Sequence, residues 1–477
     1  MAYRYGNREQ IAFFPPSIEQ YVNEDDPVRV YDAFFDALNS SGLGLVLDDN
    51  QVGPPSYYPL TMLKILVYSY SYGWRSSRKI ERALYHNLSF MWLAGGIKPD
   101  HKTISNFRKK HIPLLKETLK QCARMCLKLD LVEGNTLFVD GSKIRANAGK
   151  RQTRSKKTWE KYRGHIEKKI DELLEECEKI DAAEQESLVK KKKELKSKER
   201  LKNKIDGLIA EMEKEGLKKI NGTDPSCKIM KGRQGSHAGY NCQIVSDEAN
   251  GLIVSVEATT AMNDLNLLSG QIEKAEENLD KESQTNCADA GYSSVNDLVN
   301  LVDRSKRVVV PNNNQVKKSK KEEPFSKQAF SYNEEQDSYT CPEGKFLYRT
   351  RRKIIRGRIE YQIKDKNHCQ SCKHFGKCTK SKTGRRIYRL KNEKTKEQLA
   401  AIYESEEGQR IYNKRKMLVE HQFGHIKHNL GANAFLLRGM DGVNAELSLF
   451  GTCFNIARMI RLLGGVRVAI SKMYIIS

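Results

Sequence analysis

Two short apolar runs in the sequence each end in an aspartate. The run TLFVD ends at Asp140 and is followed by a glycine, and the run TNCAD ends at Asp289, with Gly291 just beyond. Runs of this length, bounded by turn residues, are typical of buried strands. Because helical segments surround both runs, we expect a mixed α/β fold in which each aspartate lies at the end of a strand.

A third acidic residue, Glu420, lies in the helical stretch KRKMLVEHQFGHIKHNLG. Two divalent ions roughly 3.5–4 Å apart can stabilise the attacking and leaving oxygens of an in-line displacement at phosphorus. The sequence predicts Asp140, Asp289 and Glu420 as catalytic residues and as ligands of two Mg²⁺ or Mn²⁺ ions per active site. Glu446 is the alternative third acid. Taken singly, each acid also fits a turn or a solvated helix face.

The charge of the chain points to nucleic acid. Lysine and arginine total 83 against 60 acidic residues, which gives a formal charge of +23 and a pI near 9.4. A merely basic protein or one that binds a membrane surface has this balance too, but no long apolar run, signal peptide or lipidation motif is present. The 11 cysteines are scattered and odd in number, which indicates a reducing, cytoplasmic location without membrane association.

At 477 residues the chain is too long for one hydrophobic core, so several domains are expected. The change of pattern along the chain predicts a helical DNA-binding domain, a catalytic core in three parts and two insertions. These segments are the helical domain 1–130, the core segments 131–150, 221–314 and 401–477, a helical hairpin at 151–220 and a Cys-rich insertion at 315–400.

Residues 1–130 carry apolar side chains at helical spacing. Within PDHKTISNFRKKH, Asp100 or Thr103 is a plausible helix cap, and basic residues follow near the helix end. Short helices before a basic helix suit a helix-turn-helix reader of DNA, with Arg108 and Lys109 on the DNA. An ordinary helical bundle with a solvated basic face fits this pattern equally well.

The segment 151–220 is dominated by Lys, Glu and Arg. Apolar residues recur in it at helical spacing, in two groups: Ile166, Ile170, Leu173, Cys177 and Ile180, then Leu201, Ile205, Leu208 and Met212. We expect two antiparallel helices with a coiled-coil seam, forming an arm for dimerisation or for contact with the DNA backbone.

Residues 236–260 alternate in polarity like two strands joined by a turn at 247–251, which predicts a β-hairpin. A helix over 262–279, the strand that leads to Asp289, a helix over 293–305 and a further strand at 307–313 follow. A mixed sheet with helices around it, and acids on its first strand and on a later one, is the ribonuclease-H-like topology.

Four of the cysteines are grouped in the second insertion. Cys341 lies in TCPEG, and Cys369, Cys372 and Cys378 lie in HCQSCKHFGKC. A C-x2-C pair with two further thiols is typical of a tetrahedral Zn²⁺ site, whose closed ligand set indicates a structural role. His368 or His374 could replace one sulfur, and four unrelated thiols are the alternative.

From about residue 402 the chain is helical again, and we expect one long helix that carries Glu420. Lys427 is seven residues further on and so lies on the same helical face, where it can hold a phosphate while the carboxylate binds metal. His421 and His425 lack the glutamate placement of a zincin motif. The apolar stretch 443–463 is expected to pack as a helix against the sheet.

Taken in order, these motifs resemble bacterial insertion-sequence transposases of the DDE class, in the branch with a helical N-terminal domain before an interrupted ribonuclease-H-like domain. The resemblance covers nearly the whole chain. Its motifs are PDHKTISNFRKKH, FVDGSKIRANA, GYNCQIVSDEANGLIV with MNDLNLL, ADAGYSS, the Cys-rich insertion and VEHQFGHIKHNLGANAFLLRG. It implies that Asp140, Asp289 and Glu420 occupy the three metal-binding acid positions.

The helix that carries the third acid in this family often has Tyr, Arg, Glu and Lys at a fixed spacing, which we call the family rhythm. Glu420 and Lys427 match that rhythm. Lys416 stands at the arginine position and Asn413 at the tyrosine position, with Tyr412 next to it.

The resemblance implies cleavage at the end of the element, followed by attack of the new 3′-hydroxyl on target DNA by the same in-line route. Double-stranded DNA, as terminal inverted repeats and as target, is the implied partner, and action on two ends favours a homodimer at the nucleoid. The candidate phosphate contacts are Lys143, Arg145, Lys427 and Arg438. A nuclease or resolvase without strand transfer, and an inactive relic that only binds DNA, are the alternatives.

Overall fold

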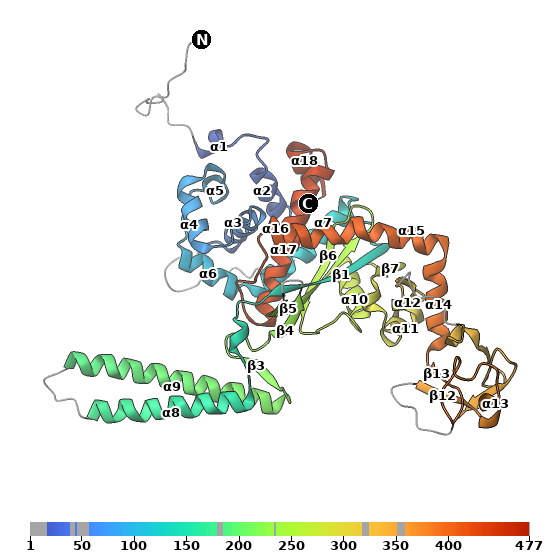
Figure 1. The fold of residues 1–477 in the computed structure, drawn as a ribbon. Helices are drawn as coiled ribbons and strands as arrows, with labels where there is room; N and C mark the ends of the chain where they lie inside the picture. The colour runs from blue at the N-terminus through green and yellow to red at the C-terminus, as the bar shows by residue number, and fades with distance from the viewer. Residues whose placement is uncertain are drawn as a thin grey trace, which may run out of the picture. The chain divides into compact units, whose positions relative to one another are not determined.

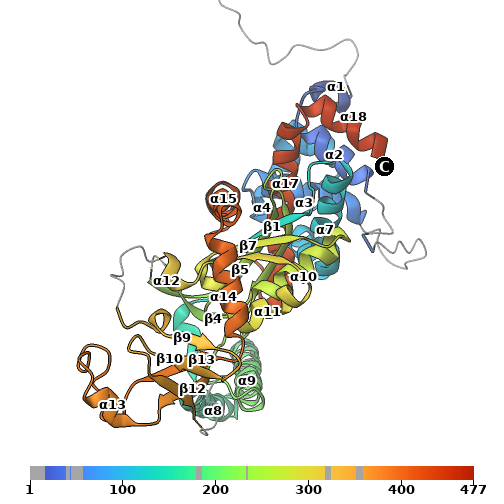
Figure 2. The same cartoon turned by 90° about the vertical axis from the view of Figure 1, so that its right-hand side faces the viewer.

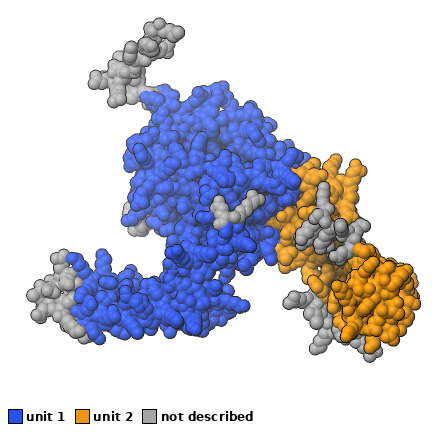
Figure 3. Space-filling view, in the orientation of Figure 1, with its two compact units in different colours: residues 1–264, 270–283, 415–477 blue, residues 265–269, 284–414 orange. Residues whose placement is uncertain are grey.

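The computed structural model describes residues 17–38, 43–44, 57–178, 185–232, 235–316, 324–350 and 358–476. Contacts within the chain divide it into two compact units, coloured in Figure 3. Unit 1 comprises residues 1–264, 270–283 and 415–477, and unit 2 comprises residues 265–269 and 284–414. The fold is mixed α/β, as expected, and none of the described helices is long and apolar enough to cross a membrane.

Unit 1 begins with helices, as the apolar spacing predicts. They are α1 (Ile18–Tyr21), α2 (Val28–Asp36), α3 (Pro59–Ser71), α4 (Ser77–His86), α5 (Leu88–Leu93), α6 (His101–Lys110) and α7 (Ile112–Lys128). The cap of α6 is Asp100, whose carboxylate accepts a hydrogen bond of 2.7 Å from the backbone N–H of Thr103. Most of α3 is buried, since it packs between α2 and the C-terminal helix α17 (Gly439–Leu462).

The sheet of unit 1 consists of antiparallel neighbours. Its strands are β1 (Thr136–Arg145), β4 (Lys228–Gly232), β5 (Gly235–Asp247) and β6 (Ile253–Thr259). The long strand β5 pairs with β1 along one edge and with β4 and β6 along the other. This confirms the predicted hairpin, whose turn is held by Asp247: its carboxylate accepts from the N–H of Ala249 at 2.9 Å and of Gly134 at 2.7 Å.

One expectation about β1 is wrong. The strand does not end at Asp140 but continues for five more residues, so Asp140 lies in its middle, opposite Ile244 of β5. Gly141 is a strand residue rather than a turn residue. The pairing with β5 explains this, because β5 is long enough to hold β1 in register from Leu137 to Arg145.

Helices cover the sheet of unit 1. The apolar C-terminal stretch forms α17, which packs on β6, α7 and α3 as expected, while α18 (Val466–Ile476) packs on α2 (Figure 1). On α10 (Leu268–Leu279), Asn278 donates a hydrogen bond of 2.9 Å to the carbonyl of Val254 on β6.

The predicted helical hairpin is present in unit 1. Helices α8 (Lys156–Glu178) and α9 (Gln185–Lys214) lie side by side in Figures 1 and 2 and share an apolar seam. Predicted seam positions that are buried or partly buried in it are Ile166, Ile170, Leu173, Leu201, Ile205, Leu208 and Met212. Ile180 lies outside the described residues. The sequence did not predict the short antiparallel pair β2 (Thr153–Ser155) and β3 (Lys219–Asn221) at the base of the hairpin, nor the burial of Trp159.

Unit 2 begins with a strand–helix–strand segment. Its elements are β7 (Thr285–Ala288), the short 3₁₀ turn Ala290–Tyr292, α11 (Val295–Asp303), β8 (Arg307–Val309) and α12 (Asn313–Val316). Strands β7 and β8 are parallel, as strands joined by a helical crossover usually are. Helix α14 (Glu393–Glu404) packs against β8 and α11.

The Cys-rich part of unit 2 folds around a sheet that the sequence did not predict. Its strands are β9 (Ser331–Asn333), β10 (Ser338–Thr340), β11 (Phe346–Arg349), β12 (Arg358–Ile363) and β13 (Arg386–Leu390), paired antiparallel in chain order. A small aromatic core stabilises them, centred on Tyr339 and Tyr361, with Cys341, Cys369 and Cys378 packed against it. The short helix α13 (Lys366–Gln370), labelled in Figure 2, includes position 369 of the sequence, which is Cys369.

The expected single helix around Glu420 is interrupted. Helix α15 (Glu406–Arg415) is followed by one turn of π-helix, Lys416–Glu420, and then by α16 (His421–His428). A π-helical turn is wider than an α-helical turn, with hydrogen bonds from residue i to i+5, and such turns are frequent at functional sites.

Candidate active site

Asp140 projects from the middle of β1. Its side chain is mostly buried, with 17% of its surface exposed. Because side chains alternate along a strand, Asp140 and Ser142 share one face of β1, while Lys143 and Arg145 lie on the other. Two of the predicted phosphate contacts, Lys143 and Arg145, therefore lie on the opposite face of β1 from the carboxylate of Asp140.

Arg415, the last residue of α15, joins two of the predicted acids. One terminal nitrogen of its guanidinium lies 3.6 Å from the carboxylate of Asp140, and the other lies 3.4 Å from the carboxylate of Glu420. The arginine side chain is 11% exposed, whereas that of Glu420 is 51% exposed. Two acids from distant parts of the sequence thus meet at one cation.

Sequence reasoning missed Arg415, although a signal for it existed. The family rhythm has an arginine four residues before the glutamate, where this chain has Lys416. Tyr412 and Arg415 both lie one residue earlier than that rhythm requires, and a shared offset of one residue indicates an extra residue between Arg415 and Glu420. The π-helical turn occupies that interval.

Lys427 lies on the same face of β1 as Asp140. Its ammonium donates a hydrogen bond of 2.5 Å to the hydroxyl of Ser142 and lies 5.6 Å from the ring centroid of Phe423. Lys427, which was predicted to share a helical face with Glu420, thus also contacts the strand that carries Asp140.

Gln422 fixes this helical segment on the sheet. Its side-chain carbonyl accepts a hydrogen bond of 2.7 Å from Ser246, and its amide donates one of 2.9 Å to the carbonyl of Gly251. Val419 and Ile426 are fully buried on the same side. Burial of apolar side chains around two satisfied polar contacts holds the segment in one register.

Asp289 lies in unit 2, directly after β7, so its predicted position at a strand end is confirmed. Its carboxylate caps the following 3₁₀ turn by accepting a hydrogen bond of 2.7 Å from the N–H of Gly291. The side chain is half-buried. One carboxylate oxygen thus orients the residue within its own unit.

Glu446, the alternative third acid, has a structural role instead. It is fully buried on α17 and forms an ion pair of 2.7 Å with Arg75. Its second oxygen accepts hydrogen bonds from the backbone N–H groups of Leu436 at 2.7 Å and Leu437 at 3.0 Å. A buried carboxylate with both oxygens engaged in this way is unsuited to bind a metal ion.

The remaining predicted DNA contacts fall into two groups. Lys109 and Arg145 are exposed, as is Arg438, which donates a hydrogen bond of 3.0 Å to the carbonyl of Asn147. Lys143 is mostly buried, 3.7 Å from the carboxylate of Asp264. The prediction for Arg108 is wrong.

Arg108 is 5% exposed and cannot reach DNA at the surface. Its guanidinium donates hydrogen bonds to the hydroxyl of Tyr70 at 3.0 Å and to the carbonyl of Arg75 at 2.8 Å. Arg75 pairs in turn with Glu446. Arg108, which was predicted to contact DNA from a helix-turn-helix motif, instead completes a buried polar network between the N-terminal helices and α17.

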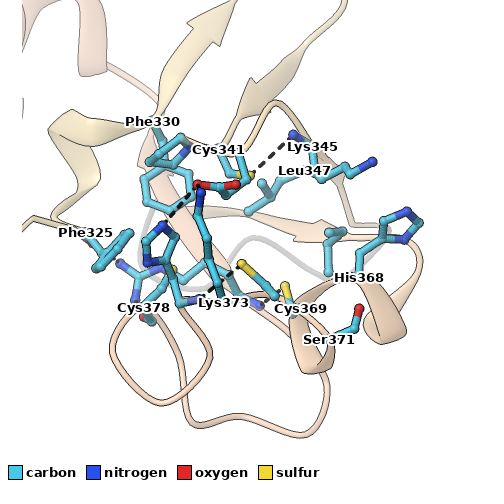
Figure 4. A pocket seen from close by; sticks show the side chains of 16 residues that line it. Phe325, Phe330, Cys341, Lys345, Leu347, His368, Cys369, Ser371, Lys373 and Cys378 are labelled. Atoms are coloured by element: carbon cyan, nitrogen blue, oxygen red, sulfur yellow. Dashed lines mark hydrogen bonds and ion pairs between the residues drawn. The ribbon is translucent and has the colours of Figure 1, made fainter.

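The four grouped cysteines line one cavity of about 320 Å³ in unit 2 (Figure 4). Three of their sulfurs accept backbone hydrogen bonds: Cys341 from Lys345 at 3.3 Å, Cys372 from His374 at 3.5 Å and Cys369 from Arg385 at 3.5 Å. Burial raises the pKa of the Cys378 thiol, Arg385 opposes that rise, and the other three cysteines add to it.

Both histidines that could replace a sulfur are held by carboxylates. Nε2 of His374 lies 3.0 Å from Glu343, and Nδ1 of His368 lies 2.8 Å from Asp365. The geometry therefore favours the four thiols over a mixed set of ligands.

No three His, Cys, Asp or Glu side chains in the described part of the chain are gathered closely enough to hold a metal ion. The donor sets still fit two kinds of ion. The carboxylates that meet at Arg415 offer the oxygen ligands that Mg²⁺ prefers. The four thiols that face one cavity offer the sulfur ligands of structural zinc.

Two family models match the chain. The model described as "Transposase DDE domain" matches residues 340–460, and the model described as "Transposase domain (DUF772)" matches residues 16–110. Both segments are therefore similar to transposase domains, the C-terminal one to a domain of the DDE class. The first match includes Glu420, Lys427 and the four grouped cysteines of this chain, and the second covers the helices that precede α7. Neither the search of curated proteins nor the search of solved structures gave a match.

Proposed function

We propose that this protein is an insertion-sequence DDE transposase that cleaves DNA at the ends of its element and joins those ends to target DNA, using divalent metal ions. The contact of Asp140 and Glu420 with one guanidinium carries the proposal. Two carboxylates 280 residues apart (420 − 140) have no reason to share a buried cation unless the fold brings them to one site. Acids so gathered in a basic chain suit a metal-dependent enzyme that acts on phosphodiesters.

The strand arrangement supports a ribonuclease-H-like core. Strands β1, β5 and β6 pair antiparallel in succession, with Asp140 on the first of them. A parallel pair, β7 and β8, comes later in the chain, and Asp289 follows β7. Three antiparallel strands and then a parallel pair, with an acid on the first strand and another after the fourth, are the strand content of that fold. The helical N-terminal residues and the two insertions complete the proposed domain organisation.

Asp140, Asp289 and Glu420 are the proposed ligands of two Mg²⁺ or Mn²⁺ ions. Such ions, when bound, activate the attacking oxygen and stabilise the leaving oxygen of an in-line displacement. Lys427 donates a hydrogen bond to Ser142, which lies two residues after Asp140 on the same face of β1. From there its ammonium can position a phosphate of the bound strand. The buried anchor Gln422 keeps Glu420 and Lys427 in a fixed relation to β1 while DNA is exchanged.

The proposed partner is double-stranded DNA, as inverted repeats at the element ends and as target, at the cytoplasmic nucleoid. Action on two ends favours a homodimer. Lys109, Arg145 and Arg438 are exposed and can bind phosphates in addition to Lys427, with a dependence on salt that grows with each contact. A formal charge of +23 supports such a partner.

A joining assay tests this function. The full-length protein is incubated with Mg²⁺, a supercoiled plasmid and a duplex that carries a pre-cut inverted repeat with a free 3′-hydroxyl. We expect a covalent product between the duplex and the plasmid. A plain nuclease would yield cut DNA without joined product, and an inactive relic would bind the duplex and leave both DNAs unchanged.

We also propose that the cavity lined by Cys341, Cys369, Cys372 and Cys378 binds one structural zinc ion. The three N–H···S hydrogen bonds support this, because such bonds stabilise thiolates and are common in turns that present sulfur to zinc. The small core of this part of unit 2 also favours a metal, since small folds with little apolar core need further cross-links.

A further inference from the structure

The contact between Arg415 and Glu420 cannot arise in a regular α-helix. Residues five apart differ by about 500°, or about 140° around the axis, so they point to well-separated faces. Side chains meet along an α-helix at separations of three and four residues. The observed distance of 3.4 Å therefore needs a local change in the helix.

The π-helical turn supplies this change. It spans Lys416–Glu420, the five residues that follow Arg415. A turn with i to i+5 hydrogen bonds places residues five apart nearly above one another. One extra residue is thereby absorbed, and Arg415 returns to the face of Glu420 and Asp140.

The sheet fixes the C-terminal side of the turn. Val419 is fully buried, and Leu418 lies over the hairpin turn, where a Cβ on Gly251 would come within 3.3 Å of its side chain. Gln422 binds Ser246 and Gly251 just beyond. Met417 is 72% exposed and faces solvent. The turn can therefore include one extra residue without disturbing the buried contacts of this segment.

Arg415 therefore has the position of a cation between two metal-binding acids. Its side chain and that of Asp140 are both mostly buried, at 11% and 17% exposed, and each terminal nitrogen faces one carboxylate. Two carboxylates close together in a half-buried site repel each other unless a cation lies between them. A divalent ion bound by the same oxygens would have to compete with the guanidinium.

We propose that Arg415 is a positioning residue that holds Asp140 and Glu420 in place before a divalent ion binds, and releases them when it does. The π-helical turn sets its position for this role. The proposal rests on the proposed function only in taking these two acids as metal ligands. Arg415 thus keeps the site formed and closed to weakly bound ions until a divalent ion displaces it.

Binding of Mn²⁺ to the full-length protein, measured by isothermal titration calorimetry without DNA, tests this. We expect Arg415→Gln to bind Mn²⁺ about tenfold more tightly than the unmodified protein, because a competing positive charge a few ångströms away is removed. The matched control Lys416→Gln removes the neighbouring exposed charge and should change the affinity by less than about twofold. Arg415→Lys keeps the positive charge but lacks the two terminal nitrogens that contact the two carboxylates. Its Mn²⁺ affinity should lie between those of Arg415→Gln and Lys416→Gln.

Thermal unfolding separates this role from a merely structural one. In EDTA, Arg415→Gln should unfold at a lower temperature than Lys416→Gln, because the two carboxylates lose the cation that they share. Saturating Mn²⁺ should then remove the difference, which a purely structural defect would not allow. Unchanged or weaker Mn²⁺ binding by Arg415→Gln would overturn the proposal.

Deletion of Met417 tests the turn itself. The deletion leaves three residues between Arg415 and Glu420, so that the two are four positions apart, a regular spacing for side chains that meet along an α-helix; the ion pair should therefore persist, and Mn²⁺ affinity should stay close to that of the full chain. Tighter binding, as in Arg415→Gln, would mean that the contact was lost and that the turn does not set it. If the deletion variant does not fold, the comparison of Arg415→Gln with Lys416→Gln decides.

The outcome is distinguishable from the fate of the proposed function. A protein that joins no DNA but shows the affinity difference loses the function and keeps the role of Arg415. A protein that joins DNA while Arg415→Gln and Lys416→Gln bind Mn²⁺ equally keeps the function and loses that role.

Discussion

The ammonium of Lys427 donates a hydrogen bond of 2.5 Å to the hydroxyl of Ser142, two residues along β1 from Asp140. Lys427 and Ser142 are 285 residues apart in the sequence. A lysine held beside the strand that carries a proposed metal ligand is well placed to contact a phosphate of the proposed DNA substrate. The contact also shows how α16 is aligned with β1.

Replacement of Lys427 by Gln should weaken binding to any duplex sequence to a similar extent. The slope of log binding constant against log salt should fall by about 0.9, the value for one lost phosphate contact. Fluorescence anisotropy over a salt series measures both quantities. Lys472→Gln, an exposed lysine on α18, is the control and should leave the slope unchanged. An unaltered slope for Lys427→Gln would remove this residue from the DNA contacts.

Gly222→Ala should destabilise the base of the helical hairpin. A Cβ at this position would lie 2.5 Å from the ring of Trp159, which is 3% exposed in the seam. The tryptophan must move, and overpacking of this kind costs about 1–3 kcal/mol. Limited proteolysis and tryptophan fluorescence follow the change.

The matched control for that variant is Gly207→Ala, in the middle of α9. A Cβ there meets nothing within 4 Å. Alanine is the better helix former by about 1 kcal/mol, so this variant should resist proteolysis at least as well as the unmodified protein. Equal behaviour of the two alanine variants would contradict the described packing of Trp159.

Glu393 should make the start of α14 sensitive to acid. Burial would raise the pKa of this carboxyl, but hydrogen bonds from Lys327, from the N–H of Leu390 and from Lys396 lower it to about 2. Burial lowers the pKa of Lys327 despite the pair, so Glu393, with its two further donors, dominates the pH dependence. Stability from this group is present above the ordinary pKa of 4.5 and is lost as pH falls from there toward 2.

Glu393→Gln should therefore lower the free energy of opening of α14 by on the order of 2–3 kcal/mol at pH 7 and by much less near pH 3. Hydrogen exchange of the α14 amides measures this locally. Glu397→Gln removes a mostly exposed carboxylate, 3.6 Å from Arg389, and should cost less than about 1 kcal/mol at either pH. A loss for Glu393→Gln that is equal at both pH values would contradict the assignment.

Zinc content should be close to one ion per chain in the purified protein and should fall sharply in Cys372→Ser. Cys177→Ser, in α8, is the control and should retain the metal. Because burial raises the pKa of Cys378, binding of zinc should release protons, and affinity should rise with pH. Metal analysis that finds no zinc in the unmodified protein, even after reconstitution with Zn²⁺, would leave the cavity without this role.

The parts of the fold that local pattern determines could be predicted. The hairpin of β5 and β6, the cap Asp100 and the strand that leads to Asp289 each depend on a few neighbouring residues, and the structure has all three. The seam of α8 and α9 follows from apolar spacing in the same way.

Features set by distant partners could not be predicted. β1 extends beyond Asp140 because β5 pairs with it there, and Arg108 is buried because Tyr70 and the carbonyl of Arg75 accept its hydrogen bonds. The five-stranded sheet of unit 2 has strands of three to six residues, too short for a clear alternation. The π-helical turn left only an offset of one residue in the sequence, which has no meaning until Arg415 is seen beside Asp140.

Asp289 is proposed to act together with Asp140 and Glu420, and the joining assay with Asp289→Asn tests this proposal most directly. Asp303→Asn, an exposed acid at the end of α11 in the same unit, is the control. We predict that Asp289→Asn joins pre-cut ends more than about a hundredfold more slowly. Loss of a residue that only hydrogen-bonds to a metal ligand already lowers metal affinity or activity by about 10–100-fold, and loss of a ligand itself should cost more. Asp303→Asn should join them at the rate of the unmodified protein. Joining by Asp289→Asn at that same rate would contradict the claim.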